Sequence, residues 1–171
     1  MATLLLLRHA KSAWGQPELQ DHDRPLDERG ERAALVMGEY IRQRRREPDM
    51  VLCSTACRAR QTWGRVQDRL TTEPQVAVEP GLYLCGWPAL LERLQRLDRS
   101  VSRAMLVAHN PDLQDLALSL VAEGSADDLA ALSRKFPTAG LAVLTYDGTD
   151  WTRLERGSAR LERFVAPKQL V

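Results

Sequence analysis

The stretch Leu4-Leu5-Leu6-Leu7, followed at once by Arg8-His9-Ala10-Lys11-Ser12, decides the fold. Four consecutive apolar residues near the start of a chain are typical of a strand buried on both faces, as central parallel strands are. In open α/β sheets, ligands bind just beyond the carboxyl ends of the strands, so the basic segment is a candidate site. Taken alone, an Arg-His pair is more often part of an ordinary surface turn.

Two later segments repeat this arrangement. Met50 to Cys53 is a second short apolar run, and Arg58 follows it at the start of a helical pattern for which Ser54 or Thr55 is a plausible N-cap. Ala104 to Ala108 is another apolar run, and His109-Asn110-Pro111 leaves its end. Because three buried strands deliver an arginine or a histidine at the same kind of position, a shared anion site becomes the better interpretation.

The order of apolar runs predicts one α/β domain over residues 1–171. Short strands at 4–7, 50–53, 76–78 and 104–108 alternate with amphipathic helices, which favours a sandwich around a mainly parallel sheet. Two more strands are expected at 141–146 and 151–155, joined as a hairpin, so that at least one edge strand runs antiparallel. Residues 13–24 are expected to form a loop that could fold over the site, and the tail after Ser158 carries no readable chemistry.

Composition excludes several classes of function. The 171 residues carry a net charge of +1, which argues against nucleic acid or an anionic membrane as the main partner. The first apolar run is too short for a signal peptide or membrane span, so a cytoplasmic location is expected. Cys53, Cys57 and Cys85 match no zinc spacing and are predicted to be reduced thiols. We expect no metal and no cofactor.

With these residues in place, the chain resembles the histidine phosphatase superfamily, whose fold is phosphoglycerate-mutase-like. The resemblance rests on Arg8-His9-Ala10, on the Ser54 to Thr62 segment with Arg58, and on His109 at a strand end. Small size, and Arg24-Pro25-Leu26 followed by Gly30, make it most similar to the short SixA-type phosphohistidine phosphatases. The resemblance implies a three-layer α/β/α sandwich and a metal-independent phosphatase that works through a phosphohistidine intermediate.

The resemblance also implies roles for individual residues. His9 is expected to attack phosphorus, while Arg8, Arg58 and His109 hold the phosphoryl oxygens. We expect further substrate contacts from side chains around them, for each of which a plain surface or structural role is the competing interpretation: Lys11, Ser12, Arg24 and Asn110. Asp21 or Asp23 could supply a proton from the loop, although aspartates in a polar loop are more often simply solvated.

Two positions depart from the family pattern. Ala10 stands where the family usually has glycine, and Leu84 stands where mutase-like members carry a glutamate that acts as proton donor. Departure of an alkoxide needs such a donor, whereas a phosphorylated imidazole can carry its own proton and leave neutral. The sequence therefore favours phosphohistidine on a protein as the substrate.

Two alternatives remain open at this point. One is a phosphomonoesterase for small sugar or nucleotide phosphates, with Asp21 or Asp23 as the acid. The other is a module that binds phosphate or a phosphoprotein without catalysis. The partner is accordingly a phosphorylated protein or a small phosphorylated metabolite.

Overall fold

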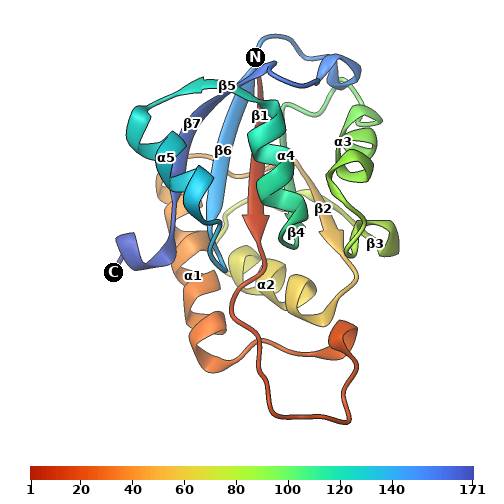
Figure 1. Cartoon of the computed structure of the whole chain (residues 1–171), viewed down its shortest axis with the longest axis vertical. Coiled ribbons are helices and arrows are strands. Elements are labelled where there is room, and N and C mark those ends of the chain that lie inside the picture. The colour runs from red at the N-terminus through yellow and green to blue at the C-terminus, as the bar shows by residue number, and fades with distance from the viewer.

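The computed structural model describes all of residues 1–171 and contains one seven-stranded sheet with the order β3-β2-β4-β1-β6-β7-β5 (Figure 1). The strands are β1 (Ala2–Arg8), β2 (Met50–Ser54), β3 (Gln75–Glu79), β4 (Arg103–Ala108), β5 (Val121–Gly124), β6 (Leu141–Tyr146) and β7 (Ala159–Val165). β1 lies in the middle, hydrogen-bonded to β4 on one side and to β6 on the other. The four-leucine run is therefore a central strand, as its composition predicts.

Helices cover both faces of the sheet (Figure 1). They are α1 (Glu28–Gln43), α2 (Cys57–Gln67), α3 (Trp87–Gln95), α4 (Asp112–Leu120) and α5 (Ala126–Arg134). Leu4 and Leu6 pack in one core with α3, α4 and α5, while Leu5 and Leu7 pack in the other core with α1 and α2. Because successive side chains of a strand point to opposite faces, one leucine run supplies both cores and gives the expected three-layer sandwich. None of the helices combines the length and apolar character needed to cross a bilayer.

The antiparallel part of the sheet differs from the sequence expectation. β3, β2, β4 and β1 run parallel, and β6 is antiparallel to both of its neighbours, β1 and β7. The outermost strand β5 pairs in parallel with β7. The prediction of an antiparallel edge strand is thus wrong, because the strand that reverses direction, β6, lies inside the sheet.

The expected strand at 151–155 is also wrong. Trp151 to Arg153 form a 3₁₀ turn, and β6 pairs instead with β7, which lies in the tail that had shown no pattern. Trp151 is fully buried, and its indole N–H donates to the Val101 carbonyl at 2.9 Å, so the turn buries the ring without a strand. The charged residues Arg160, Glu162 and Arg163 dilute the apolar signal of β7.

A close backbone approach holds the site loop against α1. A Cβ on Gly30 would lie 2.1 Å from the Lys11 carbonyl oxygen, so only glycine fits there. The same carbonyl accepts the Asp27 amide at 3.0 Å, and Asp27 caps α1 through the Gly30 amide at 2.7 Å. A bridge between Ser12 and Leu26 closes the neck of the segment, so residues 13–25 leave and return at one point.

Candidate active site

The carboxyl ends of β1, β2 and β4 meet at one pocket of about 230 Å³. The eight residues that the sequence proposed for catalysis or substrate contact all line it: Arg8, His9, Lys11, Ser12, Arg24, Arg58, His109 and Asn110. Trp14, Leu84 and Thr138 complete the lining, whereas Asp21 and Asp23 are not part of it. Parallel strands gather these residues because their carboxyl ends share one edge of the sheet.

His9 is buried and has one ring nitrogen committed to the backbone. Its Nδ1 lies 2.7 Å from the Ala10 carbonyl, which can only accept, so Nδ1 carries the proton. Burial, followed by the Arg58 and Arg8 charges, lowers the pKa of His9 to about 4 against the hydrogen bond to Ala10. The ring is therefore neutral at pH 7, with an unprotonated Nε2 that faces the Arg58 Nε at 3.4 Å.

Thr62, the last residue of the Ser54 to Thr62 motif, fixes the backbone beside His9. The Thr62 hydroxyl accepts the Ala10 amide at 2.9 Å and donates to the Arg58 carbonyl at 2.7 Å. Thr62 is fully buried, and it joins the segment after β1 to the first turns of α2. The spacing of the motif is the sequence signal for the contact between Thr62 and Arg58, because Thr62 lies one helical turn after Arg58.

His109 places a second neutral ring beside the first. The two imidazole centroids are 5.3 Å apart, and burial, followed by the charges of His9 and Arg58, lowers the pKa of His109 to about 3. Its Nε2 lies 2.8 Å from the Ser54 hydroxyl, while its Nδ1 is buried without a partner. When Ser54 donates to Nε2, the Nδ1–H is free to donate to an oxyanion in the pocket.

Ser54 consequently has a different role from the expected helix cap. The N-cap of α2 is Ala56, with no side-chain cap, and Ser54 Oγ accepts the Ala56 amide at 3.2 Å while it contacts His109. Thr55 Oγ1 lies 2.8 Å from the His22 Nε2. The N-cap prediction is wrong because both hydroxyls are engaged with histidines.

Arg8 and Arg58 are fixed by hydrogen bonds to acceptors of the protein itself. Arg8 Nη1 donates to the Phe136 carbonyl at 2.8 Å, and its buried Nε has no partner. Arg58 donates to the Asp21 carbonyl at 2.7 Å and to Asp21 Oδ2 at 3.0 Å. Two like charges share this site, and burial and the neighbouring Arg58 lower the pKa of Arg8. A bound dianion would relieve this repulsion.

The carboxylate of Asp21 pairs with both Arg24 and Arg58. The Tyr83 hydroxyl donates to it at 2.5 Å, and this bond, followed by those from Arg24 and Arg58, holds the pKa of Asp21 well below its usual range. A carboxyl that stays ionised at neutral pH has no proton to give, which argues against Asp21 as the proton donor. Asp23 lies outside the pocket beside His22, with 61% of its side chain exposed, and offers no replacement.

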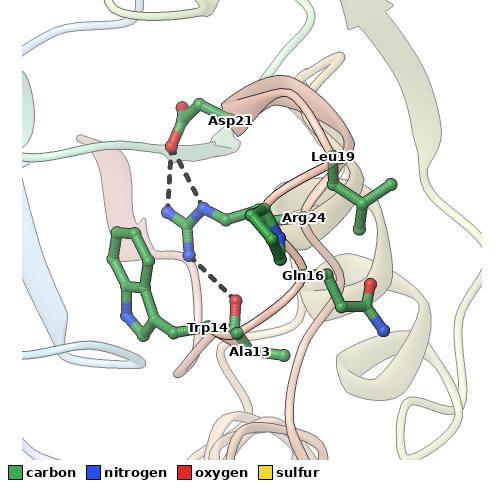
Figure 2. A pocket seen from close by; sticks show the side chains of 8 residues that line it. Ala13, Trp14, Gln16, Leu19, Asp21 and Arg24 are labelled. Carbon is green, nitrogen blue, oxygen red and sulfur yellow. Dashed lines mark hydrogen bonds and ion pairs between the residues drawn. The ribbon is translucent and has the colours of Figure 1, made fainter.

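Arg24 joins the loop to the pocket, and Figure 2 shows its side chain between Asp21 and Trp14. Its guanidinium lies 3.7 Å from the Trp14 ring centroid and donates to Asp21, to the Ala13 carbonyl and to the Ser12 hydroxyl. The loop also encloses a hollow of its own, about 260 Å³ in volume, on this side. Arg24 and Ser12 are therefore tied to each other, while Lys11 is exposed and unpaired.

Leu84, which stands where mutase-like members carry a glutamate, lines the rim of the pocket. The residue is 52% exposed, has φ of 50°, and follows the 3₁₀ turn Pro80–Leu82. Glu79 is paired with Arg93 at 2.7 Å and does not line the pocket.

Asn110 lines the pocket, but its side chain already has a partner within the protein, because its Oδ1 accepts the Gln114 amide at 3.2 Å. The pocket therefore contains cations, imidazoles and hydroxyls but no carboxylate.

Metal ligation has no obvious place in the structure. No three side chains of the His, Cys, Asp and Glu types are grouped to hold a metal ion. All three cysteines are free of disulfide bonds.

Comparisons with known proteins identify the family of this chain. The model of the histidine phosphatase superfamily (branch 1) matches residues 4–83. An uncharacterized protein of Mycobacterium leprae is 36% identical, over 95% of this chain and 100% of its own. A crystal structure assigned as the phosphohistidine phosphatase SixA of Agrobacterium tumefaciens is 33% identical with a TM-score of 0.82, and covers 97% of this chain and 98% of that one.

A second structure, assigned as SixA of Nakamurella multipartitia, is 29% identical with a TM-score of 0.82 and covers 97% of this chain and 96% of that one. Sequence and fold thus agree over nearly the whole chain. The chain belongs to the histidine phosphatase superfamily and is a phosphatase of the SixA type.

Proposed function

We propose that this phosphatase removes phosphoryl groups from phosphohistidine on proteins, with His9 as the nucleophile. The observation that carries the proposal is the state of His9: a neutral ring whose Nδ1–H is held by Ala10 and whose Nε2 lone pair faces Arg58. The position expected for a proton donor holds Leu84. The site is thus suited to a leaving group that needs no acid.

In the first step, His9 Nε2 attacks phosphorus, a new P–N bond forms, and the P–N bond of the substrate breaks. The leaving imidazole departs neutral because its other nitrogen already carries a proton. Arg8, Arg58 and the His109 Nδ1–H are placed to hold the oxygens of the transferred group while charge builds on them. The orphaned nitrogens of Arg8 and His109 acquire partners in this complex.

In the second step, water attacks phosphorus and the P–N bond to His9 breaks. The electron pair returns to Nε2, the ring is again neutral with Nδ1 protonated, and both protons of water stay with the product, which leaves as H₂PO₄⁻. No step requires the Asp21 proton, in keeping with the three donors that hold its carboxylate ionised.

A small-molecule phosphomonoesterase is the weaker candidate. An alkoxide leaving group depends on general acid catalysis for roughly 10²–10⁴-fold of its rate, and no carboxyl lines this pocket. The relatives include proteins that act on small phosphates, among them a mycobacterial glucosyl-3-phosphoglycerate phosphatase at 17% identity, a likeness that concerns the fold alone.

The test compares initial rates on a phosphohistidine peptide, on para-nitrophenyl phosphate and on sugar phosphates. The phosphohistidine peptide should give the largest kcat/KM, and a chelator should leave all rates unchanged. A sugar phosphate turned over faster than the peptide would contradict the proposal, as would activity lost to the chelator and restored by Mg²⁺.

A further inference from the structure

A second cavity, larger than the catalytic pocket, lies next to it. It has a volume of about 510 Å³ against about 230 Å³, and the two share Lys11 and Thr138 in their linings. Its walls come from the start of α1, the end of α5 and the C-terminal segment 164–169, which lies beside α1 and below α5 (Figure 1). We call this cavity the basic groove.

The charge of the basic groove is of one sign. Its lining includes five cations and no acidic residue: Lys11, Arg29, Arg134, Lys135 and Lys168. None of the five forms a salt bridge, although cations elsewhere, such as Arg42, Arg93 and Arg163, are paired with carboxylates. In a chain of net charge +1 this is a local concentration of unneutralised positive charge.

The floor of the basic groove is apolar. Phe164 is buried beneath it, and Ala33, Ala131 and Pro167 add small apolar surfaces between the cations. A surface of this kind can accept the aliphatic parts of a polypeptide while its rim attracts carboxylates. A monophosphate bound in the catalytic pocket leaves all of this surface unused, because the transferred group needs only the smaller cavity.

We infer that the basic groove binds acidic side chains of a protein substrate, next to the residue whose phosphoryl group enters the catalytic pocket. This inference rests on the proposed function and names the chemistry of the partner. The shared lining residues Lys11 and Thr138 make the two cavities neighbours, so one polypeptide segment can reach both. Contacts with exposed cations contribute roughly a factor of two each and weaken with salt.

The experiment uses two fluorescein-labelled peptides, each with one histidine flanked by glutamates or by glutamines. The groove variant carries Arg134→Gln, Lys135→Gln and Lys168→Gln. The control variant carries Arg45→Gln, Arg69→Gln and Arg153→Gln, which are exposed, line neither cavity and lower the net charge equally. Affinity of the unphosphorylated peptides is measured by anisotropy, and kcat/KM is measured after chemical phosphorylation of the histidine.

Wild type should prefer the glutamate peptide by up to about thirtyfold in both measurements, five factors of two, and the groove variant should lose roughly eightfold of that preference, three factors of two. The control variant should keep it. Equal affinity of wild type for both peptides, or equal loss in both variants, would overturn the inference. So would inorganic tripolyphosphate that binds more tightly than the glutamate peptide and is weakened only in the groove variant, since the groove would then serve a small polyanion.

Binding and turnover separate the two proposals. Selective binding of the glutamate peptide without hydrolysis of its phosphohistidine would sustain the basic groove and defeat the proposed reaction. Hydrolysis of both phosphorylated peptides at the same kcat/KM would sustain the reaction and defeat the groove.

Discussion

The floor and the rim of the catalytic pocket are built in different ways. The floor is formed by Arg8, His9 and His109, which leave buried strands and are tied to the sheet: the His9 amide donates to the Ala108 carbonyl at 3.1 Å. The rim is formed by the loop of residues 13–25, where Trp14 is 76% exposed and the contacts are made by polar side chains such as Asp21 and Arg24.

This difference indicates that the floor carries the reacting groups, whereas the rim supports them. A group on the floor cannot move without breaking the strand pairing, so it can hold a reacting atom in one place. A rim held by exposed ion pairs gains little from each of them and contributes mainly to the position of the floor cations. Substitutions on the floor should therefore change rates by orders of magnitude, and those on the rim by small factors.

The largest effect is expected from His9→Ala. Removal of the atom that bonds to phosphorus should lower turnover by about 10⁴-fold or more and leave no acid-labile phosphoenzyme. Rapid-quench labelling with a ³²P substrate measures both. Equal labelling of wild type and variant, or label on His109, would show that the nucleophile lies elsewhere.

His109→Ala tests the other half of the floor. Loss of one oxyanion donor should slow the reaction by about 10²–10³-fold, while His9 still accepts the phosphoryl group. The same labelling experiment should therefore detect phosphorylated His9 in this variant. Its complete absence would mean that His109 is required for the attack itself.

Asp21→Asn probes the rim. Its carboxylate holds Arg58 and Arg24, and each partly exposed ion pair is worth roughly 0.2–1 kcal/mol, so loss of both should lower kcat/KM by about twofold to at most about thirtyfold. The loss should be the same on phosphohistidine and on para-nitrophenyl phosphate, because Asp21 acts through the arginines. Asp23→Asn, which removes an exposed carboxylate outside the pocket, is the matched control. A loss confined to the ester would restore Asp21 as an acid.

The smallest effect concerns pH. Because burial lowers the pKa of His9 to about 4, the nucleophile is neutral above that value and gains a proton as the pH falls through it. Rates corrected for spontaneous hydrolysis should thus hold between pH 7 and 5 and halve near pH 4, with circular dichroism verifying the fold. A midpoint near 6.5, the ordinary histidine value, would mean that the ring is not desolvated.

The predictability of the fold also differs between two parts of the chain. In the parallel half, buried strands such as 4–7 and 104–108 are continuous apolar runs, so the sequence identifies them within one or two residues. In the last third, β7 mixes apolar with charged residues and Trp151 sits in a turn, so local pattern misplaced the strand. Only pairing with β6 decides which segment enters the sheet.

The sequence alone determined which four residues form the centre of the site, because Arg8, His9, Arg58 and His109 each follow a strand end or open a helix where a parallel sheet must bring them together. Tertiary structure alone decided the states of these groups and the identity of their supports. Thr62 and Tyr83 contact their partners across more than 50 positions of sequence, and pKa values depend on burial, which local pattern does not contain. The basic groove joins both ends of the chain, so its unpaired charge likewise exists only after folding.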